Sequence, residues 1–141
     1  MAITQAICSS FKQEVLEGLH DFANGGDTFK IALYTSSASL DSTTTAYTSS
    51  NETTGTGYTA GGQTLTSQSV TLSGTTAYID FGDASWTSST ISAAGALIYN
   101  STNANRAVCV LNFGGTYSST NGTFTVQFPA ATTTTAILIL N

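Results

Sequence analysis

The chain has 141 residues, only 8% of them charged, and a formal net charge of −5. This length is sufficient for one domain with a real core, and the apolar content of 40% argues against disorder. The three basic residues, Lys12, Lys30 and Arg106, are too scattered to bind a nucleic acid backbone, and no stretch approaches the roughly 18 apolar residues of a membrane span.

Residues 1–9 are expected to form an extended arm. The first residues have neither the basic region nor the long apolar run of a secretory signal. Two placements of the arm fit the sequence. It either lies across a neighbouring subunit, which would make Ile3 and Ile7 partner contacts, or pairs as an edge strand of its own domain.

An amphipathic helix is predicted over residues 10–23. Four apolar residues recur there at helical spacing: Phe11, Val15, Leu19 and Phe22. Ser9 or Ser10 would cap the start of the helix, and Ser10 and Gln13 have the spacing of a capping box. Asn24-Gly25-Gly26 would end it.

The same segment carries the residue types that catalysis would need. Glu14 and Glu17 are three positions apart, and a solvated helix face is favoured over a catalytic pair. His20, the one histidine, is predicted to face solvent or to cap the last turn, because no nucleophile motif accompanies it. No catalytic residue is therefore assigned, and the chain is predicted not to be an enzyme.

Residues 29–141 are predicted to form an antiparallel β-sandwich or jelly-roll-like domain. Ser and Thr make up about a third of the chain, so hydroxyls take the outward positions that charges usually occupy. Residues 29–34 alternate as a strand with one buried face. Residues 35–63 form a long polar stretch, predicted to be a functional loop with a short strand near 57–60.

Further strands follow at short intervals. Residues 67–81 are predicted to be a hairpin, and the apolar run 93–99 a central strand in which Gly95 marks a bulge or a close contact. A strand over 107–113 would end at Gly114-Gly115. Residues 123–128 and 136–140 would supply the last two strands.

Other candidate sites are weaker. Asp80 and Asp83 flank a Phe-Gly pair, and an Asp-stabilised turn is favoured over a calcium site, which needs six to eight oxygens. No metal or cofactor is therefore assigned. Cys8 and Cys109 are predicted to be buried free thiols, and Trp86 with the tyrosines is expected to fill the core and interfaces rather than to stack on sugars.

The charge distribution points to assembly. From residue 84 to the end, Arg106 is the only charged residue, whereas six of the chain's charges fall within the first 30 positions. Isolated monomers normally use surface charge to resist association, and catalysis needs acids and bases. The charge-poor part is therefore expected to meet neighbouring molecules.

One series of short motifs resembles a family of small structural proteins from tailed bacteriophages, and the likeness spans nearly the whole chain. The motifs are Ser10-Phe11-Lys12-Gln13-Glu14, Leu19-His20-Asp21-Phe22, residues 26–34 (GDTFKIALY), residues 55–62 (GTGYTAGG), Ala96-Leu97-Ile98-Tyr99-Asn100, Val110-Leu111-Asn112-Phe113-Gly114 and Phe124-Thr125-Val126-Gln127-Phe128-Pro129.

The resemblance implies a non-enzymatic virion protein that is made in the host cytoplasm. A capsid decoration (cement) protein that stabilises the head shell is favoured, with a head-fibre, neck or tail component, or a receptor- or glycan-binding module, as alternatives. The expected partners are the major capsid protein or other virion proteins and further copies of the chain, with a trimer favoured.

Overall fold

The computed structural model describes residues 2–140, and within them the chain is mainly antiparallel β-structure. The helix α1 spans Ser9–Leu16. The strands are β1 (Ala6–Ile7), β2 (Phe29–Tyr34), β3 (Gln63–Thr64), β4 (Ser69–Ser73), β5 (Thr76–Asp80), β6 (Ala84–Ser89), β7 (Ser92–Asn100), β8 (Arg106–Ser118), β9 (Gly122–Val126) and β10 (Leu138–Leu140).

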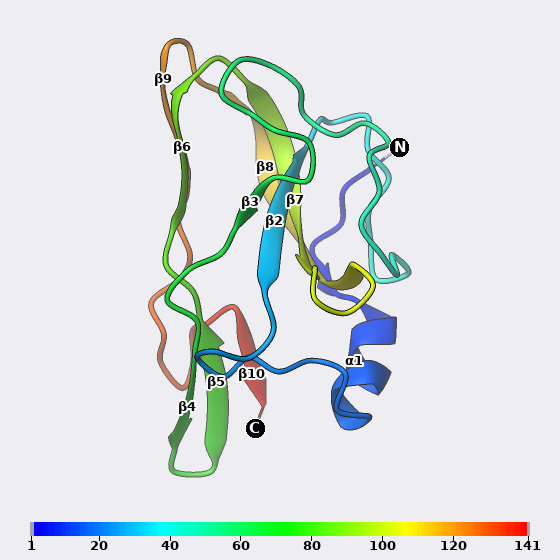
Figure 1. The fold of residues 1–141 in the computed structure, drawn as a ribbon, viewed down its shortest axis with the longest axis vertical. Helices are drawn as coiled ribbons and strands as arrows, with labels where there is room; N and C mark the ends of the chain where they lie inside the picture. Colours follow the sequence, from blue (N-terminus) through cyan, green and yellow to red (C-terminus); the bar gives the residue numbers. More distant parts are fainter. Residues whose placement is uncertain (1, 141) are drawn as a thin grey trace.

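The strands form two layers, which confirms the predicted sandwich. One layer is a five-stranded sheet in the order β1-β8-β7-β2-β3. The pair β6-β9 lies in the other layer, and the sheet β10-β5-β4 extends from that side past the end of the five-stranded sheet (Figure 1). Each of these pairings is antiparallel.

Aromatic side chains fill the space between the layers. The rings of Phe22 and Phe29 stack with their centroids 4.3 Å apart, and Phe81 lies 5.8 Å from Phe29. Trp86 from β6 and Phe124 from β9 meet edge to face and are buried, as core filling predicts. Cys8 and Cys109 are buried free thiols, which confirms that prediction.

The helix is shorter than predicted, because Gly18 ends it. Gly18 has a φ of 75°, a conformation that glycine adopts without strain. Its N–H donates to the carbonyl of Val15, and the Leu19 N–H donates to that of Glu14, which is the Schellman pattern. Residues 17–23 therefore lie outside α1, and the prediction that Asn24-Gly25-Gly26 ends the helix is wrong.

The predicted cap of the helix is also wrong. Cys8 occupies the N-cap position, and no side chain caps the helix there. The hydroxyl of Ser10 is buried without a hydrogen-bond partner, so the predicted pairing with Gln13 does not form. Tertiary contacts of the arm, rather than a capping box, position the start of α1: the Cys8 N–H donates to the carbonyl of Val108.

Strand β2 is buried on both faces rather than on one. Ala32 and Tyr34, predicted to face outward, have no exposed surface. The segment 35–63 covers this outer face: the Leu33 N–H donates to the hydroxyl of Tyr58, and the Tyr34 hydroxyl donates to the carbonyl of Thr48. The long polar segment is thus a packed cover of the sheet.

Several strand predictions are confirmed. The hairpin over 67–81 is present as β4 and β5, and a register shift occurs between Ala93 and Gly95 in the pairing of β7 with β8. Gly95 is also a close contact, because a Cβ atom there would lie 2.6 Å from the carbonyl oxygen of Leu111 and 2.8 Å from Ile3.

Other boundaries differ. Strand β8 does not end at Gly114-Gly115 but continues to Ser118. Gly114, with a φ of 81°, lies in the stretch of β8 opposite the register shift between Ala93 and Gly95, and regular pairing with β7 resumes at Tyr117. The short strand of this region is β3, not a strand at 57–60. Strand β6 is not predicted from the sequence. Its alternation of apolar and polar residues is carried by Ala84 and Trp86 alone, and the other four residues are Ser or Thr.

The arm pairs with its own domain, the second of the two predicted placements. Ala6 and Ile7 pair with Val110 and Cys109 of β8, and Ile3 forms a parallel bridge with Leu40. Ile3 packs against the core, whereas Ile7 remains 37% exposed. Of the two predicted contact residues, Ile7 is therefore exposed and Ile3 is partly buried.

Candidate functional site

His20 is buried, which corrects the prediction that it faces solvent or caps the helix. Because Gly18 turns the chain, the ring lies under α1 between Phe11 and Phe29. Its Nε2 lies 2.9 Å from a carboxylate oxygen of Glu14, and its Nδ1 lies 3.1 Å from the side-chain nitrogen of Asn100.

These contacts assign a role to both ring nitrogens. An amide nitrogen can only donate, so Nδ1 accepts from Asn100, and Nε2 carries the proton that it donates to Glu14. The second amide hydrogen of Asn100 goes to Asp27, at 2.8 Å. Neither ring nitrogen is free to accept a proton from a substrate. His20, Glu14, Asn100 and Asp27 therefore form a structural hydrogen-bond cluster.

Glu14 is the centre of this connection, which corrects its predicted place on a solvated face. Its second oxygen accepts a hydrogen bond from Arg106 of β8 at 2.8 Å. The Glu14 carboxylate thus connects three parts of the fold: α1, the turn that contains His20, and strand β8 of the five-stranded sheet. Glu17, by contrast, is exposed as predicted.

Asp83, one of the two carboxylates considered for a calcium site, makes a structural contact. Asp83 accepts a hydrogen bond from the backbone N–H of Phe128 at 2.9 Å, and this contact joins the end of β9 to the start of β6. Within residues 2–140, no group of three or more His, Cys, Asp or Glu side chains could hold a metal ion.

A second buried carboxylate, Glu52, holds the covering segment 35–63 together. It accepts hydrogen bonds from the hydroxyls of Tyr47 and Tyr58, at 2.6 and 2.5 Å, and from the N–H of Gly61 at 2.8 Å. Tyr99 stacks on Tyr47 and donates to the carbonyl of Gly61. Sequence reasoning missed this cluster, although Glu52 is the one charged residue of 42–79 and lies between two tyrosines.

Burial raises the pKa of several neutral acids. Burial, and then the charge of Glu52, raises the pKa of Tyr99 to about 12. Burial, followed by the charges of Glu14 and Asp41, raises the pKa of Cys8 to about 11. Burial raises the pKa of Cys109 to about 12.

The protein is therefore expected to lose stability in alkali. A group whose folded pKa is raised stabilises the fold fully below its unfolded pKa and loses this contribution as the pH rises through its folded pKa. The urea midpoint should fall between about pH 9 and pH 12. Absorbance at 295 nm should show buried tyrosines ionising only as the fold is lost. A midpoint that stays level across this range would contradict the assignment.

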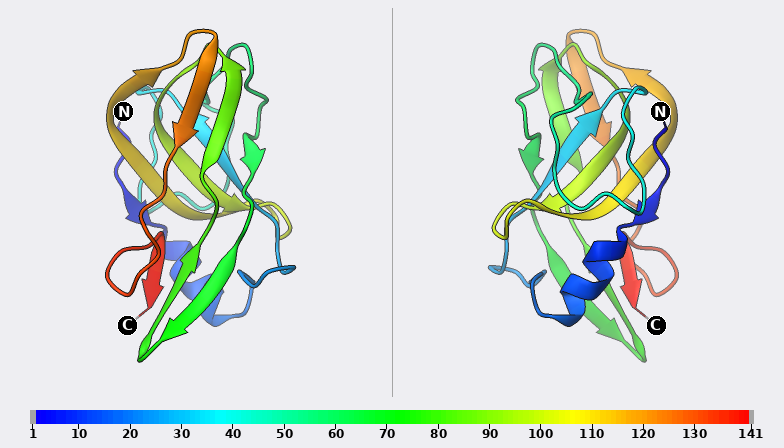
Figure 2. Two further views of the ribbon diagram at one scale, coloured as in Figure 1. Left: turned by 90° about the vertical axis from the view of Figure 1, so that its left-hand side faces the viewer. Right: turned by 90° about the vertical axis from the view of Figure 1, so that its right-hand side faces the viewer.

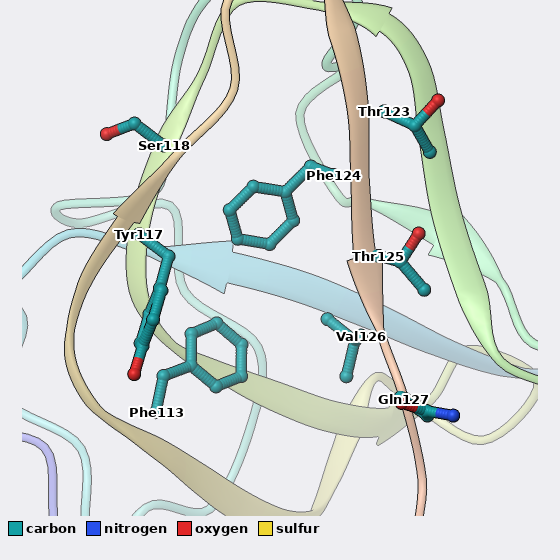
Figure 3. Close-up of a pocket in the computed structure, with 8 residues that line it drawn as sticks. All are labelled: Phe113, Tyr117, Ser118, Thr123, Phe124, Thr125, Val126 and Gln127. Atoms are coloured by element: carbon teal, nitrogen blue, oxygen red, sulfur yellow. The ribbon is translucent and has the colours of Figure 1, made fainter.

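A groove lies between β8 and β9. It has a volume of about 620 Å³. The side chains of Phe113, Tyr117, Phe124 and Val126 lie between the strands, whereas Thr123 and Gln127 point away (Figure 3). No residue of its lining is charged, so the groove suits apolar and hydroxyl contacts rather than acid–base chemistry.

A second surface is the sheet β10-β5-β4, in which Asp80 is the one charged residue and whose hairpin projects past the rest of the molecule (Figure 2). The register places Val70, Ile79 and Leu138 in one row across the three strands. Leu72, Ala77 and Leu140 form the next row on the same face, two residues further along each strand. Residues directly opposite share a face of the sheet. Ile79 and Leu138 are buried, whereas Val70, Leu72 and Leu140 are 53%, 74% and 66% exposed.

The comparisons with known proteins identify no relative: no family model, no curated protein and no solved structure matches the chain. No helix within residues 2–140 is long and apolar enough to cross a membrane.

Proposed function

We propose that the chain is a non-enzymatic structural protein of a phage virion, and specifically a decoration protein that binds the head shell in many copies. The observation that carries the proposal is the exposed apolar face of β10-β5-β4, made by Val70, Leu72 and Leu140. Exposed apolar surface of this kind marks interaction sites. The resemblance of the sequence motifs to phage structural proteins is the reason for proposing a virion as the assembly.

The use of the charged groups supports the same proposal. Carboxylates at seven positions accept hydrogen bonds from the protein itself: Glu14, Glu17, Asp21, Asp27, Asp41, Glu52 and Asp83. Two of these carboxylates, Glu14 and Glu52, are also buried, so the surface carries less charge than the composition suggests. Such a surface associates through shape, strand pairing and apolar contact, which suits repeated sites on a shell formed by a major capsid protein.

Binding to particles that lack the protein tests the proposal. Purified protein should bind to such particles in stoichiometric, icosahedrally ordered copies that cryo-electron microscopy resolves on the shell. A few copies at the neck or tail would replace decoration with a neck, tail or head-fibre role. Absence of binding at any position would contradict a virion role altogether.

The groove favours one second candidate, a glycan-binding module of the virion. Tyr117 is 57% exposed beside Phe113, and hydroxyl side chains border the groove. An exposed aromatic ring next to hydroxyls can stack on a sugar. Binding on a glycan array that is lost in Tyr117→Ala would support this candidate, whereas an array without signal, together with normal host adsorption by particles lacking the protein, would exclude it.

A further inference from the structure

Strand β4 is an unprotected edge. It pairs with β5 on one side over five uninterrupted residue pairs, and within residues 2–140 no strand pairs with its other side. All five of its residues are exposed. Natural edge strands are usually protected by Lys, Pro, a bulge or a covering loop, and β4, with the sequence SVTLS, has no such residue or bulge.

The backbone of this edge specifies what can cover it. An edge strand presents a row of N–H and C=O groups, and another extended strand is the partner that matches this row. The side chains add an apolar requirement, because Val70 and Leu72 are largely exposed on one face. The occupant must therefore be a strand with apolar residues at alternate positions.

We infer that the occupant is β4 of a second copy, paired antiparallel about a two-fold axis at Thr71. The sequence SVTLS reads alike in both directions: polar, apolar, polar, apolar, polar. In this register Thr71 faces its own copy, Val70 faces Leu72 of the second copy, and Ser69 faces Ser73. The apolar residues of both copies then lie on one face of a continuous sheet of six strands, three from each copy.

The charges permit this contact. Strand β4 carries no charge, and the one charge of the hairpin strands, Asp80, lies opposite Ser69 at the end of β5. The two-fold register places the two Asp80 side chains at opposite ends of the paired strands, so two copies with a net charge of −5 can approach without like charges meeting. A two-fold contact closes after two copies. It therefore predicts a dimer, in place of the trimer that was favoured from the sequence.

The dimer should be weak in solution. Two five-residue strands bury much less than the roughly 800 Å² per partner of a stable interface. On a shell, many copies held side by side would raise the effective concentration and strengthen the pairing. A second copy of the chain would thus be one partner in the proposed assembly. The biological role of this contact rests on the proposed function.

Site-directed cross-linking tests the register in the full chain. Thr71→Cys places a thiol opposite its own copy, so mild oxidation should yield a disulfide-linked dimer. Ser69→Cys is the matched control, because it lies on the same strand and the same face but would be about 13 Å from its own copy, too far for a disulfide. The native cysteines are both buried. Equal cross-linking of the two variants would overturn the register.

Sedimentation velocity at high micromolar concentration tests the contact without cysteines. The wild-type chain should show a concentration-dependent dimer, which Leu72→Lys should abolish. Leu16→Lys should leave the dimer unchanged, because Leu16 is 89% exposed on α1, outside the hairpin. A wild-type chain that stays monomeric, a trimer, or a dimer that survives Leu72→Lys would overturn the inference.

These results separate the inference from the proposed function. A dimer that forms in solution but never binds particles would leave the β4 contact standing and contradict the virion role. Ordered binding of monomers to the shell, without β4 pairing, would support the virion role and overturn the β4 contact.

Discussion

Replacing Glu14 with alanine is expected to destabilise the fold by about 3 kcal/mol or more. Both carboxylate oxygens of Glu14 have charged or polar partners, Nε2 of His20 and the guanidinium of Arg106. The His20 side chain has no exposed surface, so its N–H would lose its partner where water cannot readily replace it. The helix, the turn after it and β8 would lose their common contact, and the urea midpoint should fall strongly.

Glu17→Ala is the matched control for this prediction. Glu17 lies at the end of the same helix but is exposed, and its one side-chain contact is a long hydrogen bond of 3.4 Å from Gln13. Its replacement should change the free energy of unfolding by no more than about 0.5 kcal/mol. If the two alanine variants unfolded at the same urea concentration, the buried cluster would not be a major source of stability.

Gly62→Ala is expected to have an effect of similar size for a steric reason. Gly62 has a φ of 79°, and a Cβ atom there would overlap the carbonyl oxygen of Ile31 and lie 2.6 Å from its carbonyl carbon. These are backbone atoms of β2, which is paired on both sides and cannot move aside. The covering segment would have to shift off the sheet, at a cost of about 3 kcal/mol or more.

Gly74→Ala separates this overlap from backbone strain alone. Gly74, in the turn between β4 and β5, has a φ of 62°, but a Cβ atom there would meet nothing within 4 Å. Its replacement should cost only about 1 kcal/mol. Equal urea midpoints for the two variants would show that close packing of the segment on β2 contributes little.

The sequence predicts local features well where neighbouring residues determine them. The hairpin over 67–81 follows from the alternation of apolar and polar residues around a Ser-Gly-Thr-Thr turn. Gly95 marks a bulge because glycine weakens the interior of a strand and is found there mainly at bulges or close contacts. The end of the helix was missed although the signal is local. The predicted helix over 10–23 runs through Gly18, whereas the left-handed conformation of Gly18 ends the helix.

The polar clusters could not be predicted, because their members come together only in the folded chain. His20 and Asn100 are 80 positions apart, and Glu14 and Arg106 are 92 apart. A charged residue in a helix is most often solvated, so only the tertiary fold reveals that Glu14 is buried. Glu52 gave a usable local signal, as a lone carboxylate between two tyrosines in an uncharged segment.

These clusters also change the meaning of the low charge. The few charged side chains largely serve internal contacts, such as Glu14 with Arg106 and Glu52 with Tyr47 and Tyr58. The surface retains exposed charges such as Glu17 and Asp83, but it also presents hydroxyls, an apolar sheet face and an apolar groove. The structure thus combines an internally connected domain with exposed apolar surface.

Cryo-electron microscopy of purified virions tests the central proposal most directly, because it reports position and copy number together. We expect density for this fold at many equivalent positions on the head shell, with apolar surface of the β10-β5-β4 sheet or the groove covered by neighbouring protein. Virions that contain no copy of the chain would contradict it.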